Sequence, residues 1–257
     1  MKWASLITGL WIAAVAGVWW CFVPFAPEYV FDAGIGGPFP VGPNEVLTCE
    51  SRPKSPERPR IGIYGPAAIR DVRTGSILRT MLTDDDQIVA FDFETRQRLA
   101  IRRNNQLRVI RIADGAEEAV ISEAGSPNSV LQFAAFGRLL LIGELAQVRA
   151  FDSLTGELKW RQKGAALTRS PQGPRVVVLS ESNGSTIGTG MVYNLSACRL
   201  VDPETGQPHP ALGGVKCLPP VYSSRDGRFI VFRTSTGRST VYEIDSGRAL
   251  WELPEQL

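Results

Sequence analysis

A chain of 257 residues in which 44% are hydrophobic is long enough to bury one large core or two smaller ones. Its 28 Lys and Arg residues nearly balance its 26 Asp and Glu residues and form no polybasic block, which excludes a general electrostatic attraction to nucleic acid. The single histidine, His209, excludes metal sites built from several histidines, and the lack of a C-x-x-C pair removes support for zinc-ribbon and thioredoxin-like sites.

Residues 3–26 carry no charged side chain, and their length matches the roughly 20 apolar residues that a bilayer-spanning helix requires. Lys2 precedes them and Glu28 is the first charge after them. The positive-inside rule then places the N-terminus in the cytoplasm and the body of the chain on the extracytoplasmic, periplasmic side. We therefore expect residues 1–27 to form a single-pass membrane anchor. The alternative is a signal peptide cleaved at Ala14-Val15-Ala16, which would release a secreted protein.

Residues 28–60 have the composition of a Pro- and Gly-rich linker, within which Val46–Cys49 has the pattern of a short strand. From residue 61 to residue 257 the sequence is periodic, which predicts a repeat domain. Cys198 and Cys217 lie in this domain. The sequence leaves open whether they form a disulfide in an oxidising compartment or remain buried thiols.

The repeated phrase is clearest at residues 147–160. An alternating run reaches Asp152, a turn closes at Gly156, and a second run leaves through Trp160, which predicts a β-hairpin. An Asp that enters a turn accepts hydrogen bonds from the backbone N–H groups just ahead of it, and Gly adopts the positive φ that closes the turn. Both residues are therefore expected to have structural roles.

Similar turns recur along the chain. Their opening Asp residues fall at positions 71, 114, 152, 202 and 245, so successive gaps are 43, 38, 50 and 43 residues. Two copies, those at 114 and 245, read as shortened forms. A period near 40 to 45 with four strands per repeat is typical of propeller blades. The predicted turn residues are Asp71, Gly75, Asp114, Gly115, Asp152, Gly156, Asp202, Gly206, Asp245 and Gly247.

Four sets of four strands follow from the pattern. The first comprises residues 88–91, 98–101, 107–112 and 118–121; the second, 130–133, 139–142, 148–151 and 158–160; the third, 166–168, 176–179, 198–201 and a weak 210–212; the fourth, 221–222, 229–232, 240–244 and 249–253. The second strand of a set is apolar at every position, as in Leu139–Ile142, so both of its faces must be covered. A blade between two neighbours meets this demand.

Three segments carry a family resemblance. Ala150–Trp160 resembles the repeat of quinoprotein-type (PQQ-like) propellers, and Val241–Trp251 is a shorter copy of it; Ser223–Phe232 is similar to the S-x-D-G-R turn of WD-repeat and related bacterial propellers. The resemblance covers about residues 61–253 and implies an all-β propeller of about five four-stranded antiparallel blades, open or incomplete as a ring. It also implies that Trp160 and Trp251 pack between adjacent blades.

The longest interruption of the repeat is residues 181–197, between the second and third strands of the third set. In propellers this connection emerges on the same face as the loops between blades, so we expect a recognition loop there, with a tolerated surface loop as the alternative. The residues of this expected loop are Asn183, Ser185, Thr186, Thr189, Met191, Tyr193 and Asn194.

Other candidates have simpler interpretations. Asp84-Asp85-Asp86 could bind a cation, but it fits a solvated turn between blades better, and His209, between two prolines, fits a loop residue better than a base. No carboxylate pair stands out for acid–base work, since nearly every Asp is explained by a turn. We therefore expect no catalytic residue, no metal site and no cofactor.

The expected function is a membrane-tethered, non-catalytic scaffold for protein–protein interaction, with an unidentified protein partner and self-association through an open propeller edge. Binding to nucleic acid is not expected. One alternative is a quinoprotein-like oxidoreductase, which would need pyrroloquinoline quinone and Ca²⁺. Another is a periplasmic envelope-assembly scaffold, which differs only in its partner.

Overall fold

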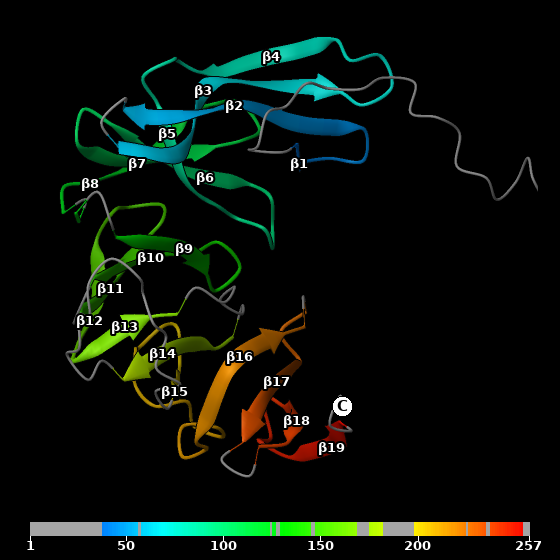
Figure 1. The fold of residues 1–257 in the computed structure, drawn as a ribbon, viewed down its shortest axis with the longest axis vertical. Helices are drawn as coiled ribbons and strands as arrows, with labels where there is room; N and C mark the ends of the chain where they lie inside the picture. Colours follow the sequence, from blue (N-terminus) through cyan, green and yellow to red (C-terminus); the bar gives the residue numbers. More distant parts are fainter. Residues whose placement is uncertain are drawn as a thin grey trace, which may run out of the picture.

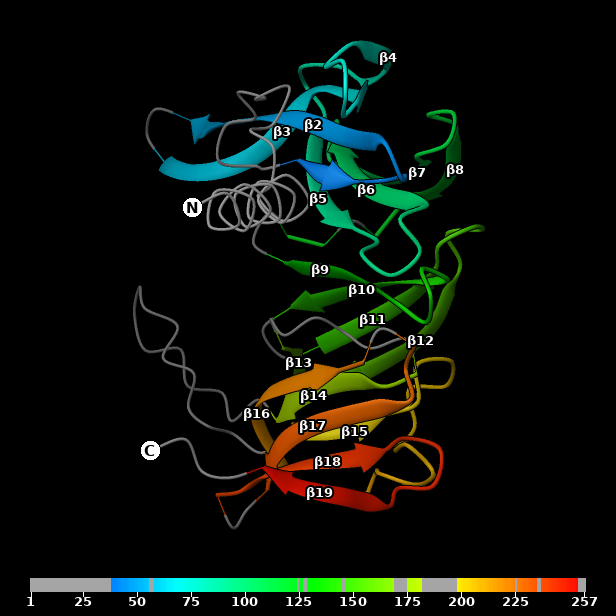
Figure 2. The same cartoon turned by 90° about the vertical axis from the view of Figure 1, so that its right-hand side faces the viewer.

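The computed structural model describes residues 38–253 except 56–57, 124, 127–128, 145–146, 169–174, 182–197, 225 and 235–236. Every regular element within these residues is a β-strand, and the strands pair antiparallel. This confirms the predicted all-β class. We divide them into units 1 to 5 in chain order. The units follow one another along an arc, with β4 near one end and β19 at the other (Figures 1 and 2).

The strand bounds define the units. Unit 1 holds β1 (Phe39–Pro40), β2 (Glu45–Ser55), β3 (Arg58–Asp71) and β4 (Ile77–Leu82); unit 2 holds β5 (Gln87–Phe91), β6 (Arg98–Arg103), β7 (Gln106–Arg111) and β8 (Glu117–Ile121). Unit 3 holds β9 (Val130–Ala134), β10 (Leu139–Glu144), β11 (Gln147–Asp152) and β12 (Leu158–Lys163). Unit 4 holds β13 (Ala165–Leu167), β14 (Val177–Glu181) and β15 (Cys198–Val201); unit 5 holds β16 (Cys217–Ser223), β17 (Phe229–Thr234), β18 (Ser239–Glu243) and β19 (Ala249–Leu253).

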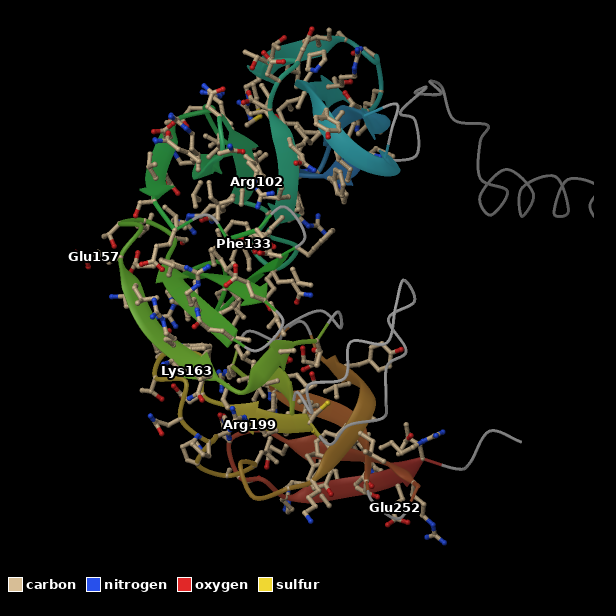
Figure 3. All side chains as sticks on the ribbon, turned by 60° about the vertical axis from the view of Figure 1, so that its left-hand side comes forward. Arg102, Phe133, Glu157, Lys163, Arg199 and Glu252 are labelled. Carbon is tan, nitrogen blue, oxygen red and sulfur yellow. The ribbon has the colours of Figure 1, made fainter. Side chains whose placement is uncertain are left out.

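The core lies between successive units, because each inner unit packs its two faces against its two neighbours. Leu140 and Ile142 of β10 face unit 2 and pack with Phe133 and residues of β5 to β8. Leu141, on the opposite face of the same strand, packs with Trp160 and with unit 4. Residues 139–142 are all buried, as their unbroken apolar pattern predicted. Figure 3 shows Phe133 inside this stack.

Three features differ from the predicted strand sets. Units 1 and 2 form one sheet because β3 pairs with β5, and units 4 and 5 form another because β15 meets β16 at Cys198 and Cys217. Only unit 3 is a separate four-stranded sheet in the described part of the chain. The weak strand expected at residues 210–212 is a turn, since its neighbour β15 pairs there with β16 instead.

Strands begin earlier than the predicted repeat domain. β2 starts at Glu45 and includes the strand expected at Val46–Cys49, so part of the segment 28–60 belongs to the sheet of unit 1. The predicted membrane anchor, residues 1–27, lies outside the described residues. Within residues 38–253, as far as they are described, no helix is long and apolar enough to cross a bilayer.

Candidate interaction surface

The antiparallel chain path gives the arc two edges. At one edge, the turn face, each unit from 2 to 5 connects its first strand to its second and, where a fourth strand exists, its third to its fourth. At the other edge, the connection face, the second strand joins the third and the chain passes to the next unit. Glu157 and Lys163, at the two ends of β12, mark these edges in Figure 3.

Six of the described five-residue turns on the turn face share one hydrogen bond. In each, the N–H of the fifth residue donates to the carbonyl of the first, at 2.8 to 3.0 Å. The turns are 71–75, 92–96, 111–115, 152–156, 202–206 and 243–247. The turn that lacks glycine places Arg96 at the fifth position with φ 59°, the left-handed conformation that the glycines adopt elsewhere.

The two turns predicted as shortened have full length, so the prediction that Asp114 and Asp245 open them was wrong. Arg111 opens the third turn and Glu243 opens the sixth, so Asp114 and Asp245 are the fourth and third residues of their turns. Asp114 forms a two-hydrogen-bond ion pair with Arg111. Asp245 pairs with Arg175 and so links unit 5 to unit 4. The sequence pattern gave no sign of this second contact.

The aspartates that open turns act as predicted. Asp71 accepts the amides of Arg73 and Thr74, and Asp202 accepts those of Glu204 and Thr205. The Thr74 amide is the main reason that the pKa of Asp71 lies below its ordinary value. Burial raises the pKa of Asp152. The amides of Leu154 and Thr155 and the nearby Lys159 together lower it by more, so the net shift of the pKa is downward.

Trp160 lies in a seat formed by the next unit. Its side chain is buried, and the indole Nε1–H donates to the carbonyl of Pro203 at 2.7 Å. A Cβ on Gly206 would approach the indole ring to 2.7 Å, so glycine is required there for close contact as well as for φ of 68°. Gln162, two residues after Trp160, donates to the carbonyl of Gly206 at 2.7 Å. Sequence reasoning found Trp160 but missed Gln162.

The packing expected for Trp251 does not occur in the structure. Trp251 of β19 pairs with Val241 of β18, as Trp160 of β12 pairs with Ala150 of β11, but Trp251 is 61% exposed. The physical reason is its place in the arc. Trp160 is covered by the turn of the following unit, whereas no further unit follows β19 in the described residues.

Three adjoining turns expose large apolar side chains. Phe93, Phe136 and Leu154 are 65%, 38% and 50% exposed and lie in the turns after β5, β9 and β11. The Phe136 amide donates to Glu94 at 3.0 Å, and the Ser153 amide donates to the carbonyl of Arg138 at 2.9 Å, so the three turns are bonded in series. We call Phe93, Phe136 and Leu154 the turn-face patch. It was not predicted, because its members come from two repeats, Phe93 from unit 2 and the other two from unit 3.

At the connection face, arginine side chains bind the chain segment that joins unit 2 to unit 3. Arg149 of β11 contacts Glu123 at 2.5 Å and Glu144 at 3.3 Å, and Arg161 also contacts Glu123. Arg102 donates to the carbonyl of Ser126, in the connection between units 2 and 3 (Figure 3). These contacts fasten the chain between units to the ends of β6, β10 and β11.

The expected recognition loop lies outside the described residues. Its members are Asn183, Ser185, Thr186, Thr189, Met191, Tyr193 and Asn194. The strands on either side of it are described: β14 ends at Glu181, β15 begins at Cys198, and Ser180 pairs with Cys198. Glu181 and Cys198, which flank the segment, therefore lie at the connection face.

The acidic run and the histidine are engaged in local contacts. Asp86 is fully buried, accepts from the backbone and side chain of Thr83, and is paired with Arg103 through two hydrogen bonds of 2.5 and 2.7 Å. His209 accepts the Ala211 amide at Nδ1, and burial lowers its pKa. Among the described residues, no group of three or more His, Cys, Asp or Glu side chains is arranged to hold a metal ion.

The cysteines of the described chain are free thiols. Cys49, Cys198 and Cys217 are buried, and Cys217 Sγ–H donates to the carbonyl of Cys198 at 3.2 Å across β15 and β16. Of the two alternatives that the sequence left open for Cys198 and Cys217, the structure therefore shows the thiols.

Comparison with known proteins gives structural likeness only. No family model matches the chain, and no curated protein matches it. The chain is similar to the crystal structure of BamB from Moraxella catarrhalis, at 14% identity and a TM-score of 0.42 over 79% of this chain and 63% of that one. It is also similar to the computationally designed Ika8 protein, at 18% identity and a TM-score of 0.46 over 82% and 59%. This chain thus spans less than two thirds of either neighbour.

Proposed function

We propose that this protein is a non-catalytic, propeller-like scaffold that binds another protein. The observation that carries the proposal is the turn-face patch. Its three exposed apolar side chains lie in adjoining turns of one edge, and apolar side chains gathered on one surface mark interaction sites more often than scattered ones do. Phe93 and Phe136 are aromatic, the residue type enriched at the centres of protein interfaces.

The patch has a rigid base, which favours binding. Phe93 packs edge-on against Phe91, with ring centroids 4.9 Å apart, and Phe91 stacks on Phe39 at 4.9 Å. On the other side, Arg138 forms an ion pair with Glu204 of the next unit at 2.5 Å. A partner that docks here meets preformed turns, so little conformational entropy is lost on binding.

The proposal includes a membrane tether and an extracytoplasmic location. They are supported by the charge-free residues 3–26 and by Lys2 on their N-terminal side. A tethered scaffold gains from a high local concentration of membrane partners, since attachment restricts the search to a surface. A partner in envelope assembly is the more specific form of the same proposal.

A second recognition surface is the segment 182–197, whose flanking residues lie at the connection face. Its support is the position of its two ends, Glu181 and Cys198, on neighbouring strands of a buried hairpin. Loops carried on such rigid strands are common recognition elements. The flanking residues of this segment and the turn-face patch lie at opposite edges of the sheets, so a variant of one leaves the other intact.

The test is crosslinking of the full-length chain in membranes, followed by affinity recovery and identification of partners. One variant is Phe93→Ser with Leu154→Ser, and the second deletes residues 183–195. The matched control is Leu158→Ser, an exposed apolar residue of β12 outside the patch. Circular dichroism and a melting curve establish that each variant is folded.

We expect the double patch variant to lose at least 90% of the recovered partner and the control to retain it. Loss on deletion of 183–195 alone would move recognition to the connection face. Unchanged recovery from both folded variants would contradict the proposed function. The identity of the partners distinguishes a general scaffold from one for envelope assembly.

A further inference from the structure

The turn of unit 1 is a close match to the turn that seats Trp160. In turns 71–75 and 202–206 the fourth and fifth residues are Thr and Gly, and the opening Asp accepts the third and fourth amides at 2.8 to 3.0 Å. In both, the Thr hydroxyl also donates to this Asp and accepts the next amide after the Gly. Gly75 and Gly206 have φ of 69° and 68°.

The residue of this turn that corresponds to Pro203 is uncovered. Pro203, whose carbonyl accepts the Trp160 indole, is buried, as are Ile112, Ser153 and Ile244 at the same position of other turns, whereas Phe93 at this position of turn 92–96 is exposed. Val72 holds this position in unit 1 and is 41% exposed. Because the two turns match, the Val72 carbonyl corresponds to the Pro203 carbonyl that accepts the Trp160 indole.

Trp251 is an indole in the matching position. Trp160 and Trp251 both pair beside a register shift in the outer hairpin, at Ala150/Phe151 and at Val241/Tyr242. The two residues therefore hold the same register position in their hairpins. Trp251 is exposed, whereas Trp160 is buried by the next unit.

The hydrogen bond to the glycine carbonyl of each turn also matches the residue two positions after each Trp. The carbonyl of Gly206 receives its hydrogen bond from Gln162, two residues after Trp160. The carbonyl of Gly75 already receives one from Arg70 of its own unit, at 2.9 Å. The residue two positions after Trp251 is Leu253, which is exposed and whose side chain has no hydrogen-bond donor. The end of unit 5 thus fits a turn whose glycine carbonyl is already satisfied.

The two surfaces cannot meet within one chain in this structure. β4, which follows turn 71–75, and β19, which carries Trp251, lie at opposite ends of the arc in both views (Figures 1 and 2). Glu252, next to Trp251, is at the free end in Figure 3. Two copies can make the contact, and because each copy has one of each surface, the contact is head-to-tail.

We propose that the protein associates with a second copy of itself by inserting Trp251 of one copy against the Asp71–Gly75 turn of the next. The contact repeats between copies the interface that Trp160 makes between units 3 and 4. The proposal deepens the proposed scaffold function, since association arranges several turn-face patches in one assembly. The partner that covers Trp251 is a second copy of this chain, which contributes its turn 71–75.

The experiment measures the mass of the full-length chain in detergent micelles by sedimentation and light scattering over a concentration series. Trp251→Ala removes the indole and keeps the turn. Val72→Arg blocks the turn and keeps the indole. Leu158→Ala, at an exposed apolar residue of β12, is the matched control. Melting curves verify that the variants are folded.

We expect the wild type and the control to associate, and each interface variant alone to dissociate at least tenfold more readily. An equimolar mixture of the two interface variants is the decisive sample. It contains one intact indole surface and one intact turn surface, so it is expected to form a heterodimer and nothing larger. Head-to-tail contact is the arrangement that predicts this complementation.

A monomeric wild type at all concentrations overturns the inference, and so does a mixture that stays monomeric. Self-association that survives both substitutions also overturns it. The proposed function is tested separately, because partner recovery depends on the turn-face patch. Trp251→Ala that is monomeric but still recovers the partner supports both proposals, whereas a self-associating wild type without a partner contradicts only the scaffold function.

Discussion

The indole Nε1–H of Trp160 donates to the carbonyl of Pro203, 43 residues later in the chain, at 2.7 Å. This bond joins the outer strand of unit 3 to the turn of unit 4. Both groups are buried, so neither can replace the bond with water. The interface between units therefore depends on a specific polar contact as well as on apolar burial.

Replacement of Trp160 by Phe removes this bond and leaves a buried carbonyl without its indole donor. We expect a loss of about 1 to 3 kcal/mol in the free energy of unfolding. Urea denaturation measures it. Trp251→Phe is the control, and because that side chain is exposed, its expected effect is within about 0.5 kcal/mol. Equal losses of stability from the two substitutions would contradict a stabilising role of the bond between Trp160 and Pro203.

Gly206→Ala tests the close approach of the turn to the indole. The cost has two parts, a positive φ that alanine tolerates poorly, at about 1 to 2 kcal/mol, and a Cβ that would clash with Trp160. Gly164→Ala separates them, since Gly164 has φ of 69° and no atom within 4 Å of the added Cβ. We expect Gly206→Ala to be the more destabilising of the two in urea denaturation. Similar losses would show that the clash relaxes freely.

Glu94 gives the fold a dependence on pH near neutrality. Burial raises its pKa to about 7 from an ordinary value of 4.5, even though the Phe136 amide lowers it. Because the pKa is higher in the folded state, the stability that Glu94 contributes is fully present below pH 4.5 and is lost as the pH rises through about 7.

Glu94→Gln keeps the acceptor for Phe136 and removes the charge. We expect wild type to lose on the order of 1 to 3 kcal/mol relative to this variant between pH 4.5 and pH 8, reduced by solvent at a partly exposed group. Urea denaturation at several pH values measures the difference. Parallel stability curves for the two proteins would show that the carboxyl titrates normally.

The buried thiols are expected to resist labelling. Burial raises the pKa of Cys49 to about 11, and a contact with Cys198 together with burial raises that of Cys217, so neither forms the reactive thiolate at pH 7.5. Maleimide labelling read by peptide mass spectrometry should modify Cys49, Cys198 and Cys217 only after denaturation. Labelling of Cys217 in the folded protein would contradict its burial.

Pyrroloquinoline quinone with Ca²⁺ tests the oxidoreductase alternative. We expect no change in melting temperature when both are added to the full-length chain. The physical reason is that the most buried acidic side chain of the run 84–86, Asp86, is already neutralised by Arg103. A rise of several degrees that requires both additives would favour the alternative.

The sequence determined the local parts of this protein. An Asp followed by Thr and Gly specifies a turn through bonds between near neighbours, so Asp71, Asp152 and Asp202 act as predicted. An unbroken apolar run such as residues 139–142 requires cover on both faces wherever it lies, and both faces are covered. These signals depend on a few consecutive residues, and distant packing leaves them unchanged.

Only the tertiary structure decided what depends on neighbours far along the chain. Trp160 and Trp251 occupy equal positions in similar sequences, but one is seated and the other exposed, since a following unit covers only the first. Arg111 and Glu243 open turns whose opening residue the pattern had placed at an Asp, because the bond that defines the turn is made by the backbone and leaves the side chain free to vary. The turn-face patch likewise exists only once separate repeats are bonded side by side.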